Sequence, residues 1–328
     1  MRVGVIGAGS WGTALACLVA GKEPVVLWGR DPERMARMGA QRENEKYLSG
    51  TRFPDSLKVT ADLADLADCE EVILAVPTTG QVAMARLLLE AGRPSRVLCA
   101  AKGYEPDTDR RMSVALADTL GPGVPVGVLA GPSHAEEVAR GIPTTVVVSA
   151  QDEATSLAWQ TTLMSPTFRV YTNPDLVGVE TAAALKNVIA IAAGICDGLG
   201  FGDNTKGALL TRGLAEIARL GEALGAAPET FSGLAGLGDL VTTCMSRHSR
   251  NRRVGEFVAQ GKTTEQARAE TGMVAEGVAT TAVALRIAEA AGVEVPITFQ
   301  VGEVLFGGKP PRRALEELME RDAKPEVR

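Results

Sequence analysis

The sequence has few of the residues that metal centres and disulfide frameworks need. It contains two histidines, His134 and His248, which argues against a histidine-rich metal site and against a Ser-His-Asp catalytic triad. The five cysteines are odd in number, lie far apart and form no C-x-x-C pair, so they indicate neither a disulfide framework nor a thiolate metal site. Unpaired cysteines fit a reducing compartment, and we expect a cytoplasmic protein without a bound metal ion.

An excess of one charge and long apolar runs are also missing. The 34 basic and 40 acidic side chains leave a net charge of −6, and neither sign forms a long run, which argues against a nucleic-acid or membrane-surface partner. Apart from the opening segment, which glycines interrupt, no apolar segment has the roughly 18 to 20 charge-free residues of a membrane span, so we expect no membrane insertion. An anionic ligand would therefore need a local basic cluster.

Short β-rich runs alternate with helical segments from Arg2 to about Thr172. Strands are predicted at Val3–Ile6, Val25–Trp28, Val72–Val76, Val97–Ala101, Val126–Leu129, Thr145–Val148 and Phe168–Tyr171. Helices are predicted between them, for example at Thr79–Glu90, Arg110–Leu120 and Asp152–Met164. This alternation predicts an α/β fold, a doubly wound parallel sheet with helices on both faces.

After Asn173-Pro174 the strand pattern stops, and an alanine- and leucine-rich chain with helical periodicity follows. We therefore predict an α/β domain of residues 1–173 and an all-α C-terminal domain of residues 174–328, and a length of 328 residues suits two domains. The first helix of the second domain is predicted from Pro174 to about Gly198, with Asn173 as its N-cap and Pro174 at its first position.

The opening stretch, MRVGVIGAGSWGTALACLVAGK, has two incompatible interpretations. One arginine followed by about twenty mostly apolar residues is typical of a secretory signal. The same stretch contains G-x-G-x-x-G, formed by Gly7, Gly9 and Gly12, between a predicted strand and a predicted helix. Such glycines allow a tight turn, the approach of a pyrophosphate and close helix packing, and the helix N-terminus favours the anion. Because further strands follow, we favour a dinucleotide site over a signal peptide or a purely structural turn.

The end of the second predicted strand bears on the choice of cofactor. An arginine there accommodates the 2′-phosphate of NADP, whereas an acidic residue binds the ribose 2′-OH of NAD. The sequence has both, Arg30 and Asp31, and Asp31 could instead cap the next helix. The pattern favours NADPH and leaves NADH open.

Two loops that follow predicted strands carry polar residues at the edge where open α/β sheets bind ligands. Lys102-Gly103 follows Val97–Ala101, and Lys102 is either a ligand-binding residue or an ordinary surface lysine. Gly131-Pro132-Ser133-His134 follows Val126–Leu129 and is either an anion-binding turn or a well-capped helix start.

Lys186 lies in the middle of an apolar face of the first helix of the second domain. Burial there would lower the pKa of a lysine toward the range that is useful for proton transfer, and we favour this role over a side chain that extends to solvent. The neighbours three, four and seven residues away are Val179, Ala182, Ala183, Ile189, Ala190 and Ala193.

An arginine-rich segment follows the glycine-rich stretch that begins at Gly233. With Ser249 as a possible N-cap, it could form a phosphate site at a helix N-terminus, and a solvated basic turn is the alternative. Asp239, which follows Gly238, could orient a lysine or a substrate hydroxyl, or cap a helix. The arginines are Arg247, Arg250, Arg252 and Arg253.

Together and in this order, these segments resemble the bacterial-type NAD(P)-dependent glycerol-3-phosphate dehydrogenases over nearly the whole chain. The resemblance implies a Rossmann-type domain followed by an α-helical substrate-binding domain. The segments that carry it are GAGSWGTALA near the start, AVPT at 75–78, AAKG at 100–103, GPSHAEEVARGIPT at 131–144, ALKNVIAIAAG at 184–194, GLAGLGDLVTTC at 233–244, SRNRRVG at 249–255 and MVAEGVATT at 273–281.

The resemblance also implies a reaction and a role for each matched residue. The enzyme would interconvert dihydroxyacetone phosphate and sn-glycerol 3-phosphate with NAD(P)H, supplying phospholipid synthesis, with Lys186 as general acid/base and Lys102 and Asp239 beside it. The implied cofactor-binding residues are Gly7, Gly9, Ser10, Trp11, Gly12, Arg30, Lys102, Ala135, Arg250, Val274 and Glu276. The implied substrate-binding residues are Lys102, Gly131, Ser133, Lys186, Asp239, Ser249, Arg250 and Asn251.

Two other functions fit part of the sequence pattern. A related two-domain dehydrogenase could act on a 3-hydroxy acid or a sugar phosphate, but the arginine-rich segment speaks against an unphosphorylated substrate. A non-catalytic NADP-sensing module would be expected to lack Lys186 or Lys102, and both are present. The oligomeric state stays open, with a homodimer as one alternative.

Overall fold

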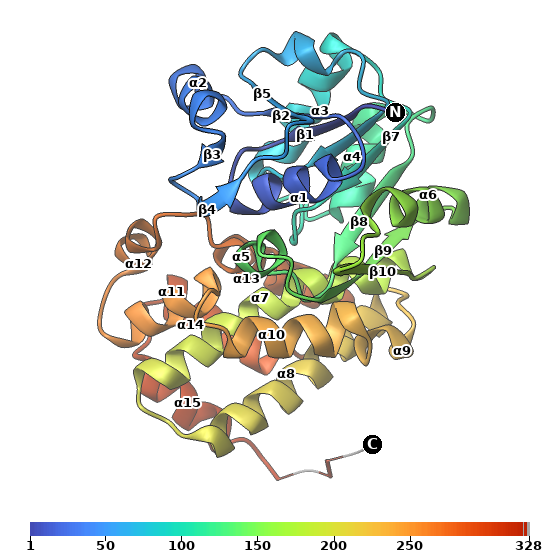
Figure 1. Ribbon diagram of the computed structural model, residues 1–328. Helices are drawn as coiled ribbons and strands as arrows, with labels where there is room; N and C mark the ends of the chain where they lie inside the picture. The colour runs from blue at the N-terminus through green and yellow to red at the C-terminus, as the bar shows by residue number, and fades with distance from the viewer. Residues whose placement is uncertain (324, 327–328) are drawn as a thin grey trace. The chain divides into compact units, whose positions relative to one another are not determined.

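The computed structural model describes residues 1–323 and 325–326, and the chain divides into two compact units (Figure 1). The first unit comprises Met1–Ala183 and Ala226–Asp239, and the second comprises Ala184–Gly225 and Leu240–Arg328.

The first unit is built on an eight-stranded sheet in the order β10-β9-β8-β7-β6-β1-β2-β5. Its strands are β1 (Val3–Ile6), β2 (Val25–Trp28), β5 (Leu57–Thr60), β6 (Glu71–Leu74), β7 (Arg96–Cys99), β8 (Val126–Ala130), β9 (Thr144–Ala150) and β10 (Phe168–Thr172). All seven predicted strands are confirmed. The edge strand β5 was missed, because only Leu57 of its four residues is buried and the pattern looks like that of a loop.

The sheet departs from the all-parallel prediction at one position. Every neighbouring pair is parallel except β8 and β9, which are antiparallel. The connection between them, residues 131–143, is close to the minimum of about a dozen residues for a parallel crossover and contains only a five-residue helix, α5 (Ala135–Ala139). β9 returns beside β8 in the antiparallel direction, and β10 pairs with β9 in parallel.

Helices cover both faces of this sheet (Figure 1). α1 (Ser10–Ala20) packs against α5 and α6 (Glu153–Leu163), and its side chains share an apolar core with Val5, Leu27 and Trp159. α3 (Thr78–Ala91) and α4 (Met112–Leu120) pack on each other and on the other face. The predicted helices at Thr79–Glu90, Arg110–Leu120 and Asp152–Met164 are thus confirmed.

The segment between β2 and β5 carries the helix expected after Asp31 and a hairpin that the sequence did not reveal. α2 (Pro32–Gln41) packs against β5, and a small antiparallel hairpin follows, made of β3 (Glu43–Asn44) and β4 (Leu48–Arg52). The hairpin is too short and too polar to show a clear alternation of apolar residues.

The chain after Thr172 is helical, and no strand occurs in its described residues, which confirms the all-α prediction. The long helices are α7 (Leu176–Gly198), which runs from the first unit into the second, and α8 (Asp203–Ala223). The others are α9 (Pro228–Phe231), α10 (Asp239–Met245), α11 (Arg250–Ala259), α12 (Thr264–Thr271), α13 (Glu276–Ala291), α14 (Pro296–Phe306) and α15 (Pro311–Met319).

The predicted start of α7 was wrong by two residues. The side chain of Asp175 accepts a hydrogen bond from the Gly178 amide at 2.9 Å, so Asp175, and not Asn173, caps the helix. Asn173 instead accepts from the Asp175 amide at 2.8 Å, in a turn that precedes the helix. The other carboxylate oxygen of Asp175 accepts from Thr230, a tertiary contact that the local sequence could not show.

α7 is the one helix in the described part of the chain that is long and apolar enough to cross a membrane by length and composition. In its most apolar window, 83% of the residues are buried inside the protein. A core helix passes the same test, so the finding is weak evidence for a membrane span.

Within the second unit, α7 and α11 approach so closely that their backbones touch. A Cβ atom added at Gly255 of α11 would lie 2.0 Å from the carbonyl oxygen of Ile191 on α7. A side chain there would push the helices apart, so the glycine fixes α11 against α7.

Candidate active-site residues

The G-x-G-x-x-G turn connects β1 to α1 and is shaped by contacts that exclude side chains. Gly7 has a φ of +117°, and a Cβ atom there would lie 2.7 Å from the carbonyl oxygen of Ala75. A Cβ atom on Gly12 would lie 1.9 Å from the carbonyl oxygen of Gly7. By contrast, a Cβ atom on Gly9 would meet no atom within 4 Å, so the middle glycine borders open space.

The start of α1 presents backbone amides beside this turn. The first hydrogen bond of the helix runs from the Thr13 amide to the Gly9 carbonyl at 3.0 Å, so the amides of Ser10, Trp11 and Gly12 precede it. Amides at a helix N-terminus suit a negatively charged group, and the space at Gly9 lets one approach. The turn therefore fits the pyrophosphate of a dinucleotide.

A buried asparagine that no motif had indicated contacts this turn. The side-chain nitrogen of Asn44 donates to the Ala8 carbonyl at 3.1 Å and to the Thr13 hydroxyl at 2.8 Å. Asn44 comes from the hairpin of β3 and β4, about thirty residues along the chain, and only the fold brings it to the glycine turn.

At the end of β2, Arg30 and Asp31 differ in their surroundings. Arg30 is exposed, whereas the carboxylate of Asp31 accepts from the Arg34 amide at 3.1 Å and caps α2. The helix-capping role considered for Asp31 is therefore observed.

Lys102 lies at the centre of a polar cluster in the first unit. Its ammonium nitrogen lies 2.7 Å from the Gly131 carbonyl oxygen, 3.1 Å from the Ser133 hydroxyl and 2.8 Å from a carboxylate oxygen of Asp239. The Lys102 side chain is 16% exposed, that of Asp239 is 2% exposed, and the two form an ion pair. The structure thus brings together four residues predicted from three separate segments.

The loop that carries Lys102 is tied to two consecutive residues of α7, neither of which the sequence analysis singled out. The Tyr104 hydroxyl donates to Thr181 at 3.3 Å, and burial raises the pKa of Tyr104 to about 12. Glu180 accepts from the Arg111 guanidinium at 2.7 Å, and Tyr104 and Arg111 pair with each other across the loop. These contacts hold both ends of the loop.

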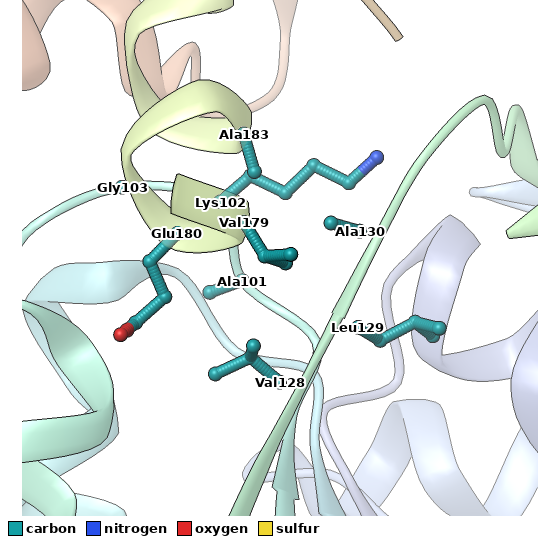
Figure 2. Close-up of a pocket in the computed structure, with 9 residues that line it drawn as sticks. All are labelled: Ala101, Lys102, Gly103, Val128, Leu129, Ala130, Val179, Glu180 and Ala183. Carbon is teal, nitrogen blue, oxygen red and sulfur yellow. The ribbon is translucent and has the colours of Figure 1, made fainter. Parts of the chain in front are cut away.

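A small cavity of about 10 Å³ adjoins Lys102 (Figure 2). It is lined by residues 101–103 and 128–130 together with Val179, Glu180 and Ala183. Figure 2 shows the ammonium group of Lys102 and the carboxylate of Glu180 pointing in different directions, so the lysine faces the polar cluster and the glutamate faces the loop anchor. Among the described residues, no group of three or more His, Cys, Asp or Glu could hold a metal ion.

Lys186 lies on α7 in the second unit and is 5% exposed. Its side chain therefore does not extend to bulk solvent, and its ammonium group donates to the Thr243 hydroxyl at 2.6 Å. Thr243, on α10, is also buried at 5% exposure. Thr243 lies within the glycine-rich motif at 233–244, and the motif alone did not indicate a role for this residue.

The arginine-rich segment forms the start of α11, and its arginines have different partners. Ser249 is the N-cap, as predicted, and its hydroxyl accepts from the Arg252 amide at 3.3 Å. The Arg252 side chain pairs with Asp197 at 2.5 Å, and the Arg253 guanidinium lies 5.7 Å from the centre of the Phe257 ring. Arg247 is exposed and Arg250 is half-buried.

Asn251 connects three helices of the second unit. Its side-chain nitrogen donates to Asn187 of α7 at 2.9 Å, and its side-chain oxygen accepts from the Gly277 amide of α13 at 2.9 Å. Nearby in sequence, Val274 is 44% exposed and Glu276 is the first residue of α13. Ala135, by contrast, is buried in the first unit, where α5 packs on α1.

A mostly parallel sheet that opens with this glycine turn and is followed by a helical unit defines a two-unit, Rossmann-type dinucleotide-binding protein. Two family models cover most of the chain: NAD-dependent glycerol-3-phosphate dehydrogenase N-terminus matches residues 2–156, and the corresponding C-terminus matches residues 175–316. The chain therefore belongs to the NAD-dependent glycerol-3-phosphate dehydrogenase family.

Individual relatives agree over the full length. The chain is 50% identical to the glycerol-3-phosphate dehydrogenase [NAD(P)+] of Geobacillus thermodenitrificans, over 99% of this chain and 96% of the relative. It is 49% identical to that of Desulfitobacterium hafniense, over 99% and 93%. The crystal structure of glycerol-3-phosphate dehydrogenase from Coxiella burnetii has a TM-score of 0.93 at 37% identity and covers 98% of this chain and 99% of its own.

Proposed function

We propose that this protein catalyses the NAD(P)-dependent interconversion of dihydroxyacetone phosphate and sn-glycerol 3-phosphate. Membership of the family supports the reaction, and relatives of about 50% identity over nearly the whole chain carry the name of this enzyme. The observation that carries the proposal is the burial of Lys186. Burying an ammonium group among apolar side chains costs free energy, and lysines at such positions are candidates for a catalytic role.

The glycine turn is the proposed site of the cofactor pyrophosphate, with Gly7, Gly9 and the amides of Ser10, Trp11 and Gly12 around it. When bound, the reduced cofactor supplies a hydride. Exposed Arg30 at the end of β2 would bind a 2′-phosphate, which favours NADPH over NADH. The other residues that we propose for the cofactor are Lys102, Ala135, Arg250, Val274 and Glu276.

In the second unit, Lys186 is the proposed general acid/base. Reduction of a ketone needs a proton at the carbonyl oxygen, and a buried ammonium group that Thr243 holds at a fixed place can deliver it. In the reverse direction neutral Lys186 would accept the hydroxyl proton. Ser249, Arg250 and Asn251, at the start of α11, are the proposed phosphate anchors, because a helix N-terminus and a guanidinium both favour phosphate.

In the first unit, Lys102 is proposed to bind the substrate oxygen and to stabilise negative charge that develops on it. Asp239 fixes the direction of the ammonium group, and the substrate oxygen would take the place of the Gly131 carbonyl or the Ser133 hydroxyl as one of these three acceptors.

The proposal extends to the domain division, the cellular location, the partners, the metabolic role and the oligomeric state. Residues 1–173 would form the NAD(P)-binding domain and residues 174–328 the substrate-binding domain, since every strand of the large sheet lies between Val3 and Thr172. The enzyme would be cytoplasmic, would act on small molecules without inserting into a membrane, and would supply glycerol 3-phosphate for phospholipid synthesis. A homodimer is the oligomer to test first, by light scattering.

The function is tested by the initial rates of NADPH and NADH oxidation with dihydroxyacetone phosphate, and with dihydroxyacetone as the matched control. Turnover with the phosphorylated ketone alone is expected, faster with NADPH than with NADH. Equal turnover of both ketones would remove the phosphate site from the proposal. Failure to consume either cofactor would overturn the reaction and make 3-hydroxy acids the next substrates to test, in the oxidative direction.

A further inference from the structure

The side chain of Asn44 is completely buried, at 0% exposure, beneath the glycine turn. Its nitrogen bridges two groups on either side of the start of α1: the Ala8 carbonyl inside the turn and the Thr13 hydroxyl one turn into the helix. Thr13 is itself 0% exposed, and its amide bonds the Gly9 carbonyl. One side chain from a distant hairpin thus holds the turn and the helix together.

The contact with Ala8 determines where the next amide points. In a trans peptide the carbonyl oxygen of one residue and the N–H of the next point in opposite directions, and no cis peptide bond occurs in the described residues. When Asn44 draws the Ala8 carbonyl toward the hairpin, the Gly9 N–H is turned away from the hairpin. We propose that Asn44 is a positioning residue for the cofactor, which sets the Gly9 amide toward the pyrophosphate.

The hydrogen bonds of Asn44 indicate that the turn uses the side-chain N–H donor of this residue and not its oxygen. The side-chain oxygen of Asn44 is buried and has no hydrogen-bond partner among the described residues, an arrangement that costs free energy. Leucine has a similar volume and would avoid that cost. The asparagine is explained if the turn requires an N–H donor at this place, since only the nitrogen side of the amide is used.

Backbone hydrogen bonds of the hairpin fix the position of Asn44. Asn44 pairs with Leu48, and Glu43 pairs with Arg52. The chain closes behind the hairpin where the Phe53 amide donates to the Arg42 carbonyl at 2.8 Å. Because the backbone on both sides of Asn44 is hydrogen-bonded, the hairpin acts as a rigid support for a contact that the turn itself cannot make.

The test replaces Asn44 with leucine in the full-length protein and measures the Kd of NADPH by its fluorescence, together with the Tm of the cofactor-free protein. We expect Kd to rise at least about tenfold while Tm changes by no more than a few degrees. ADP-ribose, which contains the pyrophosphate and lacks the nicotinamide, should lose affinity by the same factor in a competition titration. At saturating NADPH, kcat should stay within about twofold of wild type.

A matched control removes a buried hydrogen bond at the opposite end of the parallel strands. The Thr162 hydroxyl donates to Glu71 at 2.7 Å, at the beginning of β6, whereas the glycine turn follows the end of β1. Thr162→Val should lower Tm and leave Kd unchanged. Thr13→Val, which removes one of the two acceptors of Asn44, covers the case in which N44L does not fold, and it should raise Kd by a smaller factor.

This inference rests on the proposed function only through cofactor binding. If wild type fails to bind NADPH and NADH, both the proposed function and the role of Asn44 are overturned. If wild type binds NADPH and the Asn44→Leu and Thr13→Val variants bind it equally well, the role of Asn44 alone is overturned. A fall in Tm and kcat with an unchanged Kd would likewise make Asn44 a packing residue.

Discussion

The two lysines proposed for chemistry are fixed in different ways. Lys102 lies in the loop that follows β7, an interior strand of the sheet, is 16% exposed and is paired with the carboxylate of Asp239. Lys186 lies in the middle of a 23-residue helix, is 5% exposed and donates to the neutral hydroxyl of Thr243. Both ammonium groups contact residues from elsewhere in the chain, but the helix fixes the backbone of Lys186, whereas the backbone of Lys102 depends on the contacts of its loop.

This contrast shows which mutations should matter in each unit. The position of Lys102 depends on acceptors more than 25 residues away along the chain, and on Glu180 and Thr181, which hold its loop. The backbone position of Lys186 depends on α7, whose contact with α11 requires Gly255. We therefore expect loss of a partner to affect Lys102 more than Lys186.

The largest effect is expected at Lys186. Lys186→Met keeps most of the apolar stem and removes the ammonium group, so kcat should fall at least about 100-fold, the usual value of general acid–base assistance. The Kd of NADPH should be nearly unchanged. Lys206→Met, which removes an ion pair with Asp197 in the same unit, is the control and should keep kcat within a few-fold. Turnover of Lys186→Met near the wild-type rate would end the proposed role of this lysine.

A smaller effect is expected when the ion pair at Lys102 is broken from its acidic side. Asp239→Asn keeps the shape of the side chain and removes the charge that holds the ammonium group. Since a hydrogen bond to a charged group is worth about 1.5–3 kcal/mol, kcat/KM for dihydroxyacetone phosphate should fall about 10- to 150-fold. Thr243→Val removes the hydroxyl that contacts Lys186, and it should lower kcat/KM by a smaller factor than Asp239→Asn does. A larger loss for Thr243→Val than for Asp239→Asn would reverse the comparison of the two units.

The third effect concerns the arginines at the start of α11, which look alike in sequence and differ in structure. Arg250→Ala should raise the KM for dihydroxyacetone phosphate about tenfold, because a charge-assisted contact to phosphate is lost. Arg253 lies over the Phe257 ring, so Arg253→Ala should leave KM almost unchanged. Equal effects of the two substitutions on steady-state KM would place the phosphate elsewhere.

Local patterns were enough to predict part of this molecule. The seven predicted strands are short runs rich in apolar residues, and Ser249 was found as a cap because an N-cap acts on an amide three residues away. The burial of Lys186 followed from helical spacing, since its neighbours on the same face are apolar.

The contacts that were missed depend on tertiary structure. Asn44 reaches Ala8 across 36 residues, and Glu180 reaches Ser113 across 67, so no window of sequence contains both partners. The antiparallel β9 was missed because strand direction depends on the length of a connection, and the length of α5 is not visible in an apolar pattern. The cap of α7 was misplaced because Asn173 and Asp175 both suit a cap, and only the hydrogen bond from the Gly178 amide to Asp175 distinguishes them.

Within the helical unit, stability should depend on pH through Glu216. This carboxylate on α8 accepts from the amides of Ile297 and Thr298 at 2.8 Å each, at the start of α14. Burial raises the pKa of Glu216 above its ordinary value, despite the opposing hydrogen bond from the Thr298 hydroxyl. The folded state therefore binds the proton of Glu216 more tightly than the unfolded state does. The resulting stabilisation of the folded state is fully present below the ordinary pKa of glutamate and is lost as the pH rises through the pKa of Glu216 in the folded state.

Glu216→Gln removes this titration and one strong acceptor, and should cost about 1–3 kcal/mol of unfolding free energy in urea. The margin by which wild type exceeds the variant should be largest near pH 4 and should shrink toward pH 7. A margin that grows with pH would contradict the raised pKa. An ionised Glu216 would then stabilise the helical unit, as ionised Asp239 stabilises the position of Lys102, and the two units would differ less than we infer.

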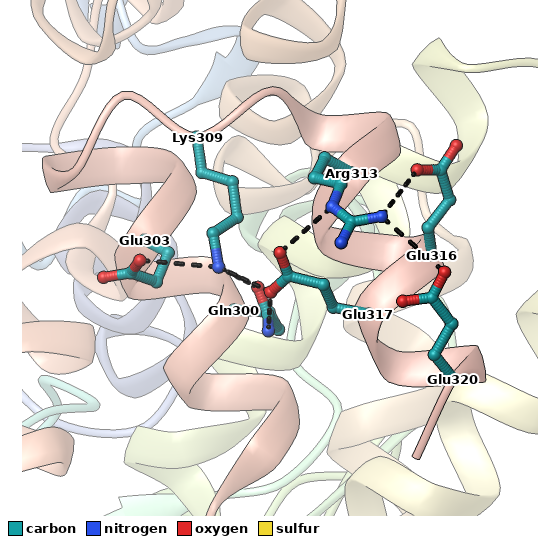
Figure 3. Close-up of polar contacts among 7 residues, drawn as sticks. All are labelled: Gln300, Glu303, Lys309, Arg313, Glu316, Glu317 and Glu320. Atoms are coloured by element: carbon teal, nitrogen blue, oxygen red, sulfur yellow. Dashed lines mark hydrogen bonds and ion pairs between the residues drawn. The ribbon is translucent and has the colours of Figure 1, made fainter.

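The smallest effect is expected at the surface network that joins α14 to α15 (Figure 3). Lys309 contacts Glu317 at 2.7 Å and Glu303 at 3.4 Å, and Arg313 contacts Glu317 at 3.2 Å. These pairs raise the pKa of Lys309 and lower that of Glu317, but salt screens charges that lie near water. Lys309→Met should therefore lower Tm by no more than about 2 °C, and 0.5 M NaCl should abolish the difference. If Tm falls by several degrees and the fall persists in 0.5 M NaCl, ion pairs stabilise the helical unit as well as close helix packing. The contrast between an ion-paired Lys102 loop and a helical unit stabilised by packing would then be wrong.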